Sequence, residues 1–210
     1  MKNLNKQISA VCIALAAIFF TLIPAHLKAQ TTFKFFPGKD ATIKVLGLSN
    51  VHDWTMTSSV MESQGDFKFD KDDQLHSLTS FSFSMDAKSL KSEHESMDNR
   101  TYKTMKADKY PKIIYKLNSA VITMLQKNKY LIKATGDLTI AGTTQTITMD
   151  ITATVGADKT IYCTGSEKLK LTDYKIEPPS FMLGAMKVKN DLTIQFNLQY
   201  KNSQLLTKNN

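Results

Sequence analysis

The stretch that decides the fold, residues 130–155, reads YLIKATGDLTIAGTTQTITMDITATV. Both halves alternate apolar with polar side chains, and threonine fills most of the polar positions in the second half. A period of two places the apolar side chains on one face of an extended strand and the polar ones on the other. We therefore predict a β-hairpin that turns at Gly142-Thr143-Thr144. Its single dry face must be buried by curling or stacking the sheet.

The same alternation recurs along the rest of the chain, at residues 41–45, 65–70, 80–85, 113–117, 121–124 and 192–200. We count roughly eight to ten strands separated by short turns, a spacing typical of an up-and-down barrel or a sandwich. We predict an all-β fold, a single closed antiparallel barrel of about eight strands. The residues expected to face inward are Phe81, Phe83, Leu138, Ile140, Ile147, Met149, Ile194 and Phe196.

Two segments interrupt the β-pattern. Residues 89–110 are polar and predict a short helical insertion, with Ser92 as N-cap and Glu95 completing a capping box. Residues 177–189 contain two prolines followed by the apolar run SFMLGAM, residues 180–186. This second segment either plugs one end of the barrel or acts as a lid through Phe181, Met182 and Leu183, and both interpretations stay open.

The N-terminal residues predict export. Two early lysines precede an apolar run from Ile8 to Ile23, and small residues follow, as in a secretory signal peptide cleaved after Ala29. The run of about 16 residues is short for a membrane span, so we expect no stable membrane insertion, although an uncleaved anchor is the alternative. Residues 30–201 then form one β-barrel domain and residues 202–210 a flexible tail.

An outer-membrane barrel is a further alternative, because alternation alone does not tell the inside of a barrel from its outside. The strands are short, aromatic girdles are absent from the sequence, and a helical insertion has no place in a short periplasmic turn. We therefore expect the apolar faces of the strands to point inward.

Charge and cysteine content narrow the functional classes. The formal net charge is +8, but the basic residues are dispersed among acidic ones, so we expect no nucleic-acid binding. Cys163 is the one cysteine beyond the predicted signal peptide, which excludes an internal disulfide. It shares a strand face with Ile161, and we predict a small buried apolar residue rather than a reactive thiol. An intermolecular bridge through Cys163 stays open, as does a homodimer.

Motifs for catalysis are absent from the sequence. It contains neither a Gly-x-Ser-x-Gly elbow nor a His-Glu-x-x-His zinc motif, and His52, His76 and His94 are scattered. Glu93, His94 and Glu95 are helical neighbours that point in different directions. We predict no catalytic residues, no metal site and no cofactor.

Three segments, in order, resemble a known family: MKADKYP at 105–111, GDLTIAGTT at 136–144 and EPPSF at 177–181. They look like the YceI-like family of exported lipid-binding proteins, and the resemblance covers about Thr32 to Tyr200. It implies a lipocalin-like barrel around an elongated apolar cavity for an isoprenoid chain, a helical segment packed at the barrel, and a periplasmic or secreted location. The sequence VHDW at 51–54 resembles a variant found near the first strands of some members.

We therefore expect a protein that binds a long apolar, isoprenoid-like lipid inside the barrel, as a carrier or storage protein without catalysis. The predicted cavity-lining residues are Phe81, Phe83, Met85, Ala134, Leu138, Ile140, Ile147, Met149, Ala153 and Phe196. An eight-stranded barrel can also be filled by its own side chains. The alternative is thus an exported barrel with a filled core that serves as a structural or protein-interaction module.

Overall fold

The computed structural model describes residues 32–203. The predicted signal peptide and residues 204–210 of the predicted tail lie outside the described residues. The described part contains eleven strands and the α-helix α2 (Glu95–Thr104). The strands are β1 (Thr32–Phe35), β2 (Thr42–Ser49), β3 (Asp53–Ser58), β4 (Glu62–Phe69), β5 (Leu75–Asp86), β6 (Lys112–Gln126), β7 (Lys129–Ile140), β8 (Thr143–Val155), β9 (Ile161–Lys170), β10 (Ser180–Phe181) and β11 (Met186–Asn202).

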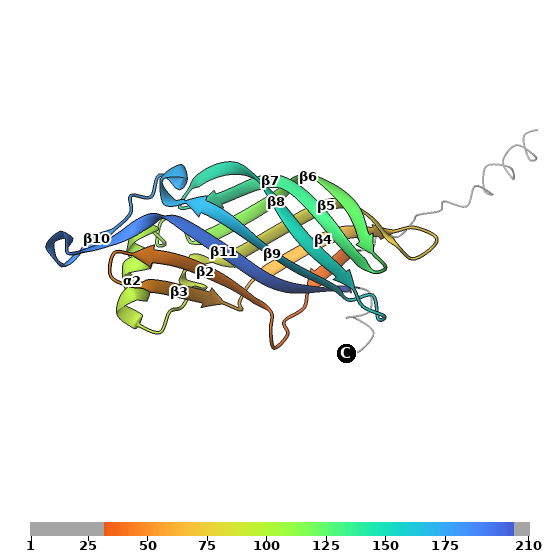
Figure 1. Ribbon diagram of the computed structural model, residues 1–210, viewed down its shortest axis with the longest axis horizontal. Coiled ribbons are helices and arrows are strands. Elements are labelled where there is room, and N and C mark those ends of the chain that lie inside the picture. The colour runs from red at the N-terminus through yellow and green to blue at the C-terminus, as the bar shows by residue number, and fades with distance from the viewer. Residues whose placement is uncertain (1–31, 204–210) are drawn as a thin grey trace, which may run out of the picture. The chain divides into compact units, whose positions relative to one another are not determined.

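Eight of these strands close into one antiparallel barrel (Figure 1). Neighbouring strands follow the order β4-β5-β6-β7-β8-β9-β11, and β1 completes the ring by pairing with both β4 and β11. The predicted fold class, a single lipocalin-like antiparallel barrel of eight strands with a short helical insertion, is therefore confirmed.

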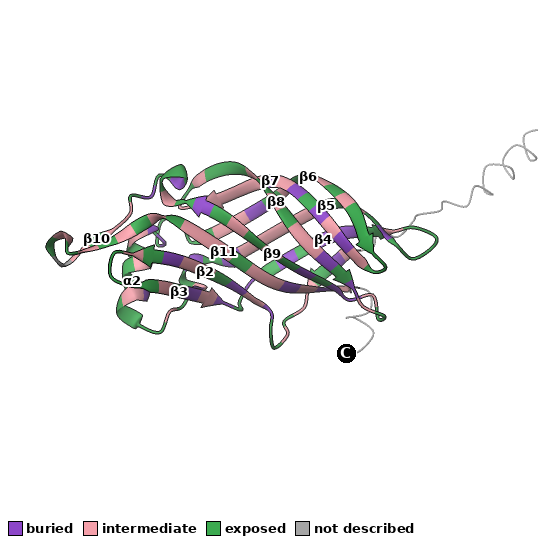
Figure 2. Cartoon of the chain, in the orientation of Figure 1, coloured by how far each residue is buried: buried purple, intermediate pink, exposed green. Residues whose placement is uncertain are grey.

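The predicted hairpin is formed by β7 and β8, in register from Lys129 opposite Thr154 to Ile140 opposite Thr143. Its turn consists of Ala141 and Gly142, one residue earlier than predicted, and both have positive φ, 49° and 78°. Positive φ at both central residues defines the type I′ turn, whose twist matches that of the two strands. The turn chemistry therefore fixes a register that places the whole apolar face on one side. Figure 2 shows the corresponding alternation of more buried and more exposed residues along the strands.

Strand β6 differs from the two separate strands predicted at 113–117 and 121–124. It is continuous from Lys112 to Gln126, and its pairing with β7 shifts register between Leu117 and Ser119. The one additional residue in this bulge resets the alternation, so a single strand looks like two patterns in the sequence. After the bulge, Ala120 and Ile122 pack against the core and Val121 is exposed.

Strands β2 and β3 extend the sheet beyond the ring, at the end of the barrel that also carries α2 and β10 (Figure 1). There β2 takes the place of β1 beside β11, pairing with residues 188–197 of that strand. The outer edge of β3 is met at one point, where Thr57 and Lys91 exchange two backbone hydrogen bonds of 2.7 and 2.8 Å. Segment 88–94, which precedes α2, therefore lies beside the outer edge of β3.

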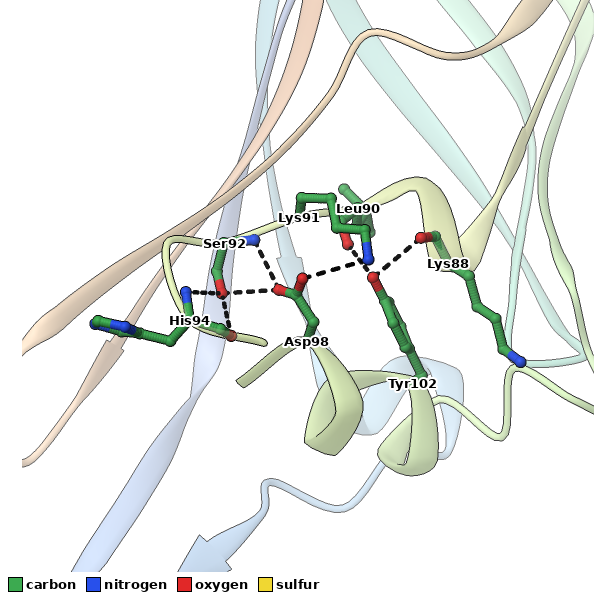
Figure 3. A network of polar contacts seen from close by, with 7 residues as sticks. All are labelled: Lys88, Leu90, Lys91, Ser92, His94, Asp98 and Tyr102. Atoms are coloured by element: carbon green, nitrogen blue, oxygen red, sulfur yellow. Dashed lines mark hydrogen bonds and ion pairs between the residues drawn. The ribbon is translucent and has the colours of Figure 1, made fainter. Parts of the chain in front are cut away.

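Helix α2 is shorter than predicted and starts differently. Its N-cap is His94, without a side-chain cap, because the Ser92 hydroxyl accepts a hydrogen bond from the His94 amide and lies 2.8 Å from Asp98 Oδ1. The capping box of Ser92 and Glu95 is therefore wrong. Asp98 takes its place and accepts a 2.7 Å hydrogen bond from the Ser92 amide (Figure 3).

The Asp98 carboxylate is also an electrostatic anchor for this segment. Burial disfavours its charge, but the hydrogen bonds from Ser92 and the ammonium of Lys91, 3.5 Å away, outweigh burial and hold its pKa below the usual value. One turn further along α2, the Tyr102 hydroxyl lies 2.6 and 3.0 Å from the carbonyls of Leu90 and Lys88 (Figure 3). These contacts hold segment 88–94 against the helix.

The segment 177–189, predicted as a plug or a lid at one end of the barrel, contains a short hairpin. Ser180 and Phe181 form β10 and pair with Lys187 and Met186 at the start of β11. At its other end, β11 extends to Asn202, the first residue of the predicted tail, which pairs with Phe33 of β1.

The candidate ligand-binding cavity

An apolar cavity of about 150 Å³ lies in the barrel interior. Nine of the ten predicted lining residues lie on its wall: Phe81, Phe83, Met85, Ala134, Leu138, Ile140, Ile147, Met149 and Phe196. The tenth, Ala153, is fully buried but is not among the lining residues, so its placement was wrong. It pairs with Tyr130 and Cys163, in the part of the barrel that large side chains fill.

A second cavity of about 260 Å³, the mouth cavity, lies beside the helix. It brings together Trp54 of β3, Met97 and Arg100 of α2, and Phe181 of β10, residues that are far apart in the sequence. The two cavities share six lining residues: Val45, Leu90, Ile113, Ile140, Leu169 and Ile194. They therefore adjoin across these six apolar residues, and we call the two neighbouring cavities, from α2 to the barrel interior, the apolar path.

Two large aromatic side chains that line the interior pack closely over glycines of the neighbouring strand. Phe196 is paired with Gly165, and a Cβ atom on that glycine would lie 2.3 Å from the Phe196 ring. Phe81 and Gly65 form a second such pair, at 2.8 Å. A ring that packs on a bare backbone lies along the wall, which leaves space in the middle of the barrel.

The opposite end of the barrel is densely filled. Phe33, Phe67, Tyr130 and Tyr200 are each at most 2 % exposed, and Phe67 packs against Phe33 and Tyr200 with ring centroids 5.6 and 5.9 Å apart. The hydroxyl groups of both tyrosines are hydrogen-bonded. Tyr130 Oη accepts from the amide of Leu75, and Tyr200 Oη lies 3.1 Å from Ser63 Oγ. We call these four aromatic residues the aromatic plug.

One carboxyl group faces the interior cavity among the described lining residues, that of Glu167. It follows Cys163 and Gly165 on the inward face of β9 and stands opposite Ile194. Burial raises its pKa above the usual value, and the charge of Asp150 adds to the effect. Glu167 was not among the predicted lining residues, although the alternation of residues 161–169 places it on the inward face.

The mouth cavity contains polar atoms without partners. Trp54 Nε1 and Tyr174 Oη, from two lining residues, are buried and have no hydrogen-bond partner in the described part of the chain. Tyr115 Oη, on the wall of the interior cavity, is a third such atom, and burial raises the pKa of Tyr115 to about 12. Leaving a buried donor unpaired costs about 1–3 kcal/mol.

The residues predicted as a lid differ in where they lie. Phe181 lines the mouth cavity, and the guanidinium of Arg100 lies 4.8 Å from the centre of its ring. Leu183 instead points to solvent with a relative exposure of 110 %, at a positive φ of 56°, so its assignment to a lid was wrong. The side chain of Met182 lies outside the described residues.

His52 and Trp54 lie at the β2–β3 turn, on the wall of the mouth cavity. The Ser49 hydroxyl accepts hydrogen bonds from the amides of Val51 and His52 and thereby shapes the turn. The ring of Trp54 packs on Gly47, where a Cβ atom would lie 2.0 Å from it. The Ser49 turn and the packing of Trp54 on Gly47 therefore shape this part of the mouth cavity.

Cys163 is a free, buried cysteine on the wall of the interior cavity, as predicted. Burial raises the pKa of its thiol to about 12, so the nucleophilic thiolate is not formed near neutral pH.

Neither a metal cluster nor a membrane helix is found among residues 32–203. They contain no group of three or more histidine, cysteine, aspartate or glutamate residues that could hold a metal ion. Within the same range, no helix is both long and apolar enough to span a bilayer.

Comparisons with known proteins agree with this geometry. Residues 20–200 match the family model described as the YceI-like domain. BcnA of Burkholderia cenocepacia has a similar fold, with a TM-score of 0.60 and 18 % identity over 76 % of this chain and 95 % of BcnA. A polyisoprenoid-binding domain from Saccharophagus degradans has a TM-score of 0.60 and 12 % identity, over 82 % of this chain and 99 % of that domain.

No curated protein sequence matches the chain. The family match nevertheless spans most of the sequence, including all the strands of the barrel and the helix at its mouth. The segments whose resemblance was noted in the sequence also lie within it. The chain therefore belongs to the YceI-like family.

Proposed function

We propose that this protein binds an apolar, isoprenoid-like chain inside the barrel, as an exported carrier or storage protein that does not transform its ligand. The apolar path from the mouth cavity into the barrel is the observation that carries the proposal. Membership of the YceI-like family and the polyisoprenoid-binding description of the similar S. degradans domain support this ligand class. The predicted signal peptide supports export. A filled core would not account for the cavity.

The cavity volume limits what can bind without rearrangement. A dry cavity of about 150 Å³ holds a benzene-sized molecule, so the interior cavity accommodates about one five-carbon unit. Longer chains require side chains of the wall to move. Met85 and Met149 lie on that wall, and unbranched methionine side chains readily adopt new conformations.

The energetics also indicate how chain length is selected. Each buried five-carbon unit contributes about 4 kcal/mol at about 0.8 kcal/mol per methylene-sized group. Non-covalent affinity saturates near about −18 to −21 kcal/mol, so five or so units already reach that limit. Additional burial cannot discriminate among longer chains. The aromatic plug, which ends the path, therefore sets the accepted length by exclusion.

The first test is to purify the protein without detergent, extract it with organic solvent and identify released lipids by mass spectrometry. Stripped protein is then titrated with unbranched and isoprenoid alcohols of increasing length. We expect an apolar chain in the extract, or saturable binding of added chains with a sharp length limit. An extract without lipid, together with no binding of any added chain, would reject the proposal.

A paired substitution tests the location of the site. Gly165→Val should push the Phe196 ring from the wall into the lumen and shorten the longest chain bound. The control is Ser166→Val, at the adjacent exposed position of the same strand, which should leave the chain profile unchanged. Equal chain profiles in the two folded variants would place the ligand outside the barrel.

A further inference from the structure

The mouth cavity carries basic side chains and no acidic ones. Among its described lining residues are His52, His94, Arg100 and Lys170, and none is aspartate or glutamate. All four are exposed, so they lie where the apolar path meets solvent. We call these four residues the basic rim. They come from the β2–β3 turn, from the start and the middle of α2, and from the end of β9.

The two permanent cations of the basic rim form no salt bridge among residues 32–203, although Asp191 is the register partner of Lys170 on β11. Elsewhere in the described chain, five lysines pair with aspartates, among them Lys91 with Asp98 and Lys88 with Asp108. Neither Arg100 nor Lys170 forms such a pair. Asp98, on the same helix as Arg100, is buried and already engaged by Ser92 and Lys91.

Arg100 is positioned to bind an anion. Its guanidinium lies over the ring of Phe181, 4.8 Å from the ring centre. Stacking on an aromatic face uses the plane of the guanidinium and leaves its N–H groups, which point outward in that plane, available. Such a group binds phosphate or carboxylate oxygens in pairs. Phe181 also lines the cavity, so the contact holds the cation at the edge of the apolar path.

The interior has the opposite character. Its described lining is apolar apart from tyrosine hydroxyls, the Cys163 thiol and the carboxyl group of Glu167. A low-dielectric space without a positive charge disfavours an anionic group. An anionic group on a bound chain is thus disfavoured inside the barrel and attracted to the cations at its mouth.

We propose that the ligand is an anionic amphiphile whose apolar chain enters the barrel and whose single phosphate or carboxylate group is held by the basic rim, chiefly by Arg100 and Lys170. This inference rests on the proposed function, because it specifies the head group of the same ligand. It also fixes the direction of the ligand, with the chain toward the aromatic plug and the charge at α2.

The test compares ligands that share one chain. Lipid-stripped protein is titrated calorimetrically with farnesol and with farnesyl monophosphate at the same ionic strength and pH 7.5. An exposed ion pair contributes up to about fivefold in affinity. At about threefold for each of the two cations, Arg100 and Lys170, we expect the monophosphate to bind about tenfold tighter than the alcohol. Inorganic phosphate alone should not bind measurably, because it lacks the chain.

Substitutions then locate the effect. Arg100→Gln and Lys170→Gln should each lower the ratio of monophosphate to alcohol affinity about threefold. The matched controls are Lys103→Gln on the same helix and Lys168→Gln on the same strand, both exposed and neither on the cavity wall. They should leave the ratio unchanged.

The outcomes separate this inference from the proposed function. Equal affinity for the two ligands in the unmodified protein, or an equal fall in the ratio in rim and control variants, overturns the basic rim as a head-group site. In either case farnesol binding still supports the apolar site. If neither farnesol nor its monophosphate binds, the proposed function fails together with this inference.

Discussion

The two ends of the barrel use aromatic side chains in different ways. At the closed end, the rings of the aromatic plug are almost fully buried, and the hydroxyls of Tyr130 and Tyr200 have hydrogen-bond partners. At the mouth, Trp54 and Tyr174 bury polar atoms that have no partner in the described chain, and Phe181 is only partly buried. The closed end thus stabilises the fold through packed rings and hydrogen-bonded hydroxyls. The mouth stabilises it less, because its buried polar atoms are unpaired and a cavity remains between its side chains.

The largest expected difference between the two ends is the free energy of unfolding that is lost when an aromatic ring is removed. Phe67→Ala removes a ring that is 2 % exposed from the aromatic plug and should lower the free energy of unfolding by about 3–5 kcal/mol. Phe181→Ala, the control at the mouth, should cost about 1 kcal/mol or less, because the ring is only partly buried. Urea denaturation followed by circular dichroism measures both. Equal losses would mean that the mouth is packed like the closed end.

The second effect concerns the attachment of α2 at the mouth. Asp98→Ala leaves the Ser92 amide without its acceptor and should lower the free energy of unfolding by about 1–3 kcal/mol. Asp108→Ala, which removes an exposed ion pair with Lys88, should cost about 1 kcal/mol or less.

The contribution of Asp98 should also depend on pH. Its pKa is lower in the folded protein than the usual value of 3.8, so the unfolded chain takes up the proton first as the pH falls. The stabilisation is therefore complete above the unfolded pKa and disappears as the pH falls through the folded value. Unfolding measured from pH 7 to pH 3 should show the difference between wild type and Asp98→Ala shrinking toward acid. A constant difference would contradict the role of the charge.

A smaller effect distinguishes the two ends by their hydroxyl groups alone. Tyr200→Phe removes the contact with Ser63 and should cost about 1 kcal/mol in the free energy of unfolding. Tyr174→Phe removes a buried hydroxyl without a partner and should be neutral or stabilising. Thermal melting of the two variants side by side measures this difference. A larger loss for Tyr174→Phe would show that its hydroxyl is paired.

The same contrast explains what could be predicted from the sequence. Within β7 and β8 the alternation is uninterrupted, so the inward face from Tyr130 to Ile140 was predicted correctly apart from the exact turn. The bulge in β6 adds one residue and interrupts the alternation of apolar and polar side chains. No residue type at this position marks the bulge in the sequence. Glu167 could have been placed inward by counting along β9, but only apolar side chains were predicted to line the cavity.

The mouth was predicted less well because it depends on tertiary structure. Trp54, Arg100 and Phe181 meet only because β2, β3, α2 and β10 gather at one end of the barrel, which no local pattern encodes. Leu183 looked like a lid residue because it is apolar, yet the positive φ of the tight turn directs it to solvent. The prediction that Ala153 lines the cavity was wrong for a different reason. Ala153 lies on the inward face as predicted, but at a position along the barrel beyond the cavity.

The central claim, that the ligand lies inside the barrel, is tested most directly by Ala134→Trp. Ala134 is 1 % exposed and lines the interior cavity, so the indole should occupy the ligand's space. Overpacking costs about 1–3 kcal/mol, so Leu138→Trp, at a less buried position of the same wall, serves as a second variant. Val121→Trp, on the exposed side of the neighbouring strand, is the control.

The measurement is the longest isoprenoid chain bound by each folded variant, read by mass spectrometry of a mixture of chain lengths offered to stripped protein. We predict that Ala134→Trp and Leu138→Trp shorten that chain by at least one five-carbon unit, while Val121→Trp binds the same chains as the unmodified protein. Unchanged chain lengths in both interior variants, with circular dichroism showing that the barrel is folded, would contradict a ligand site inside the barrel.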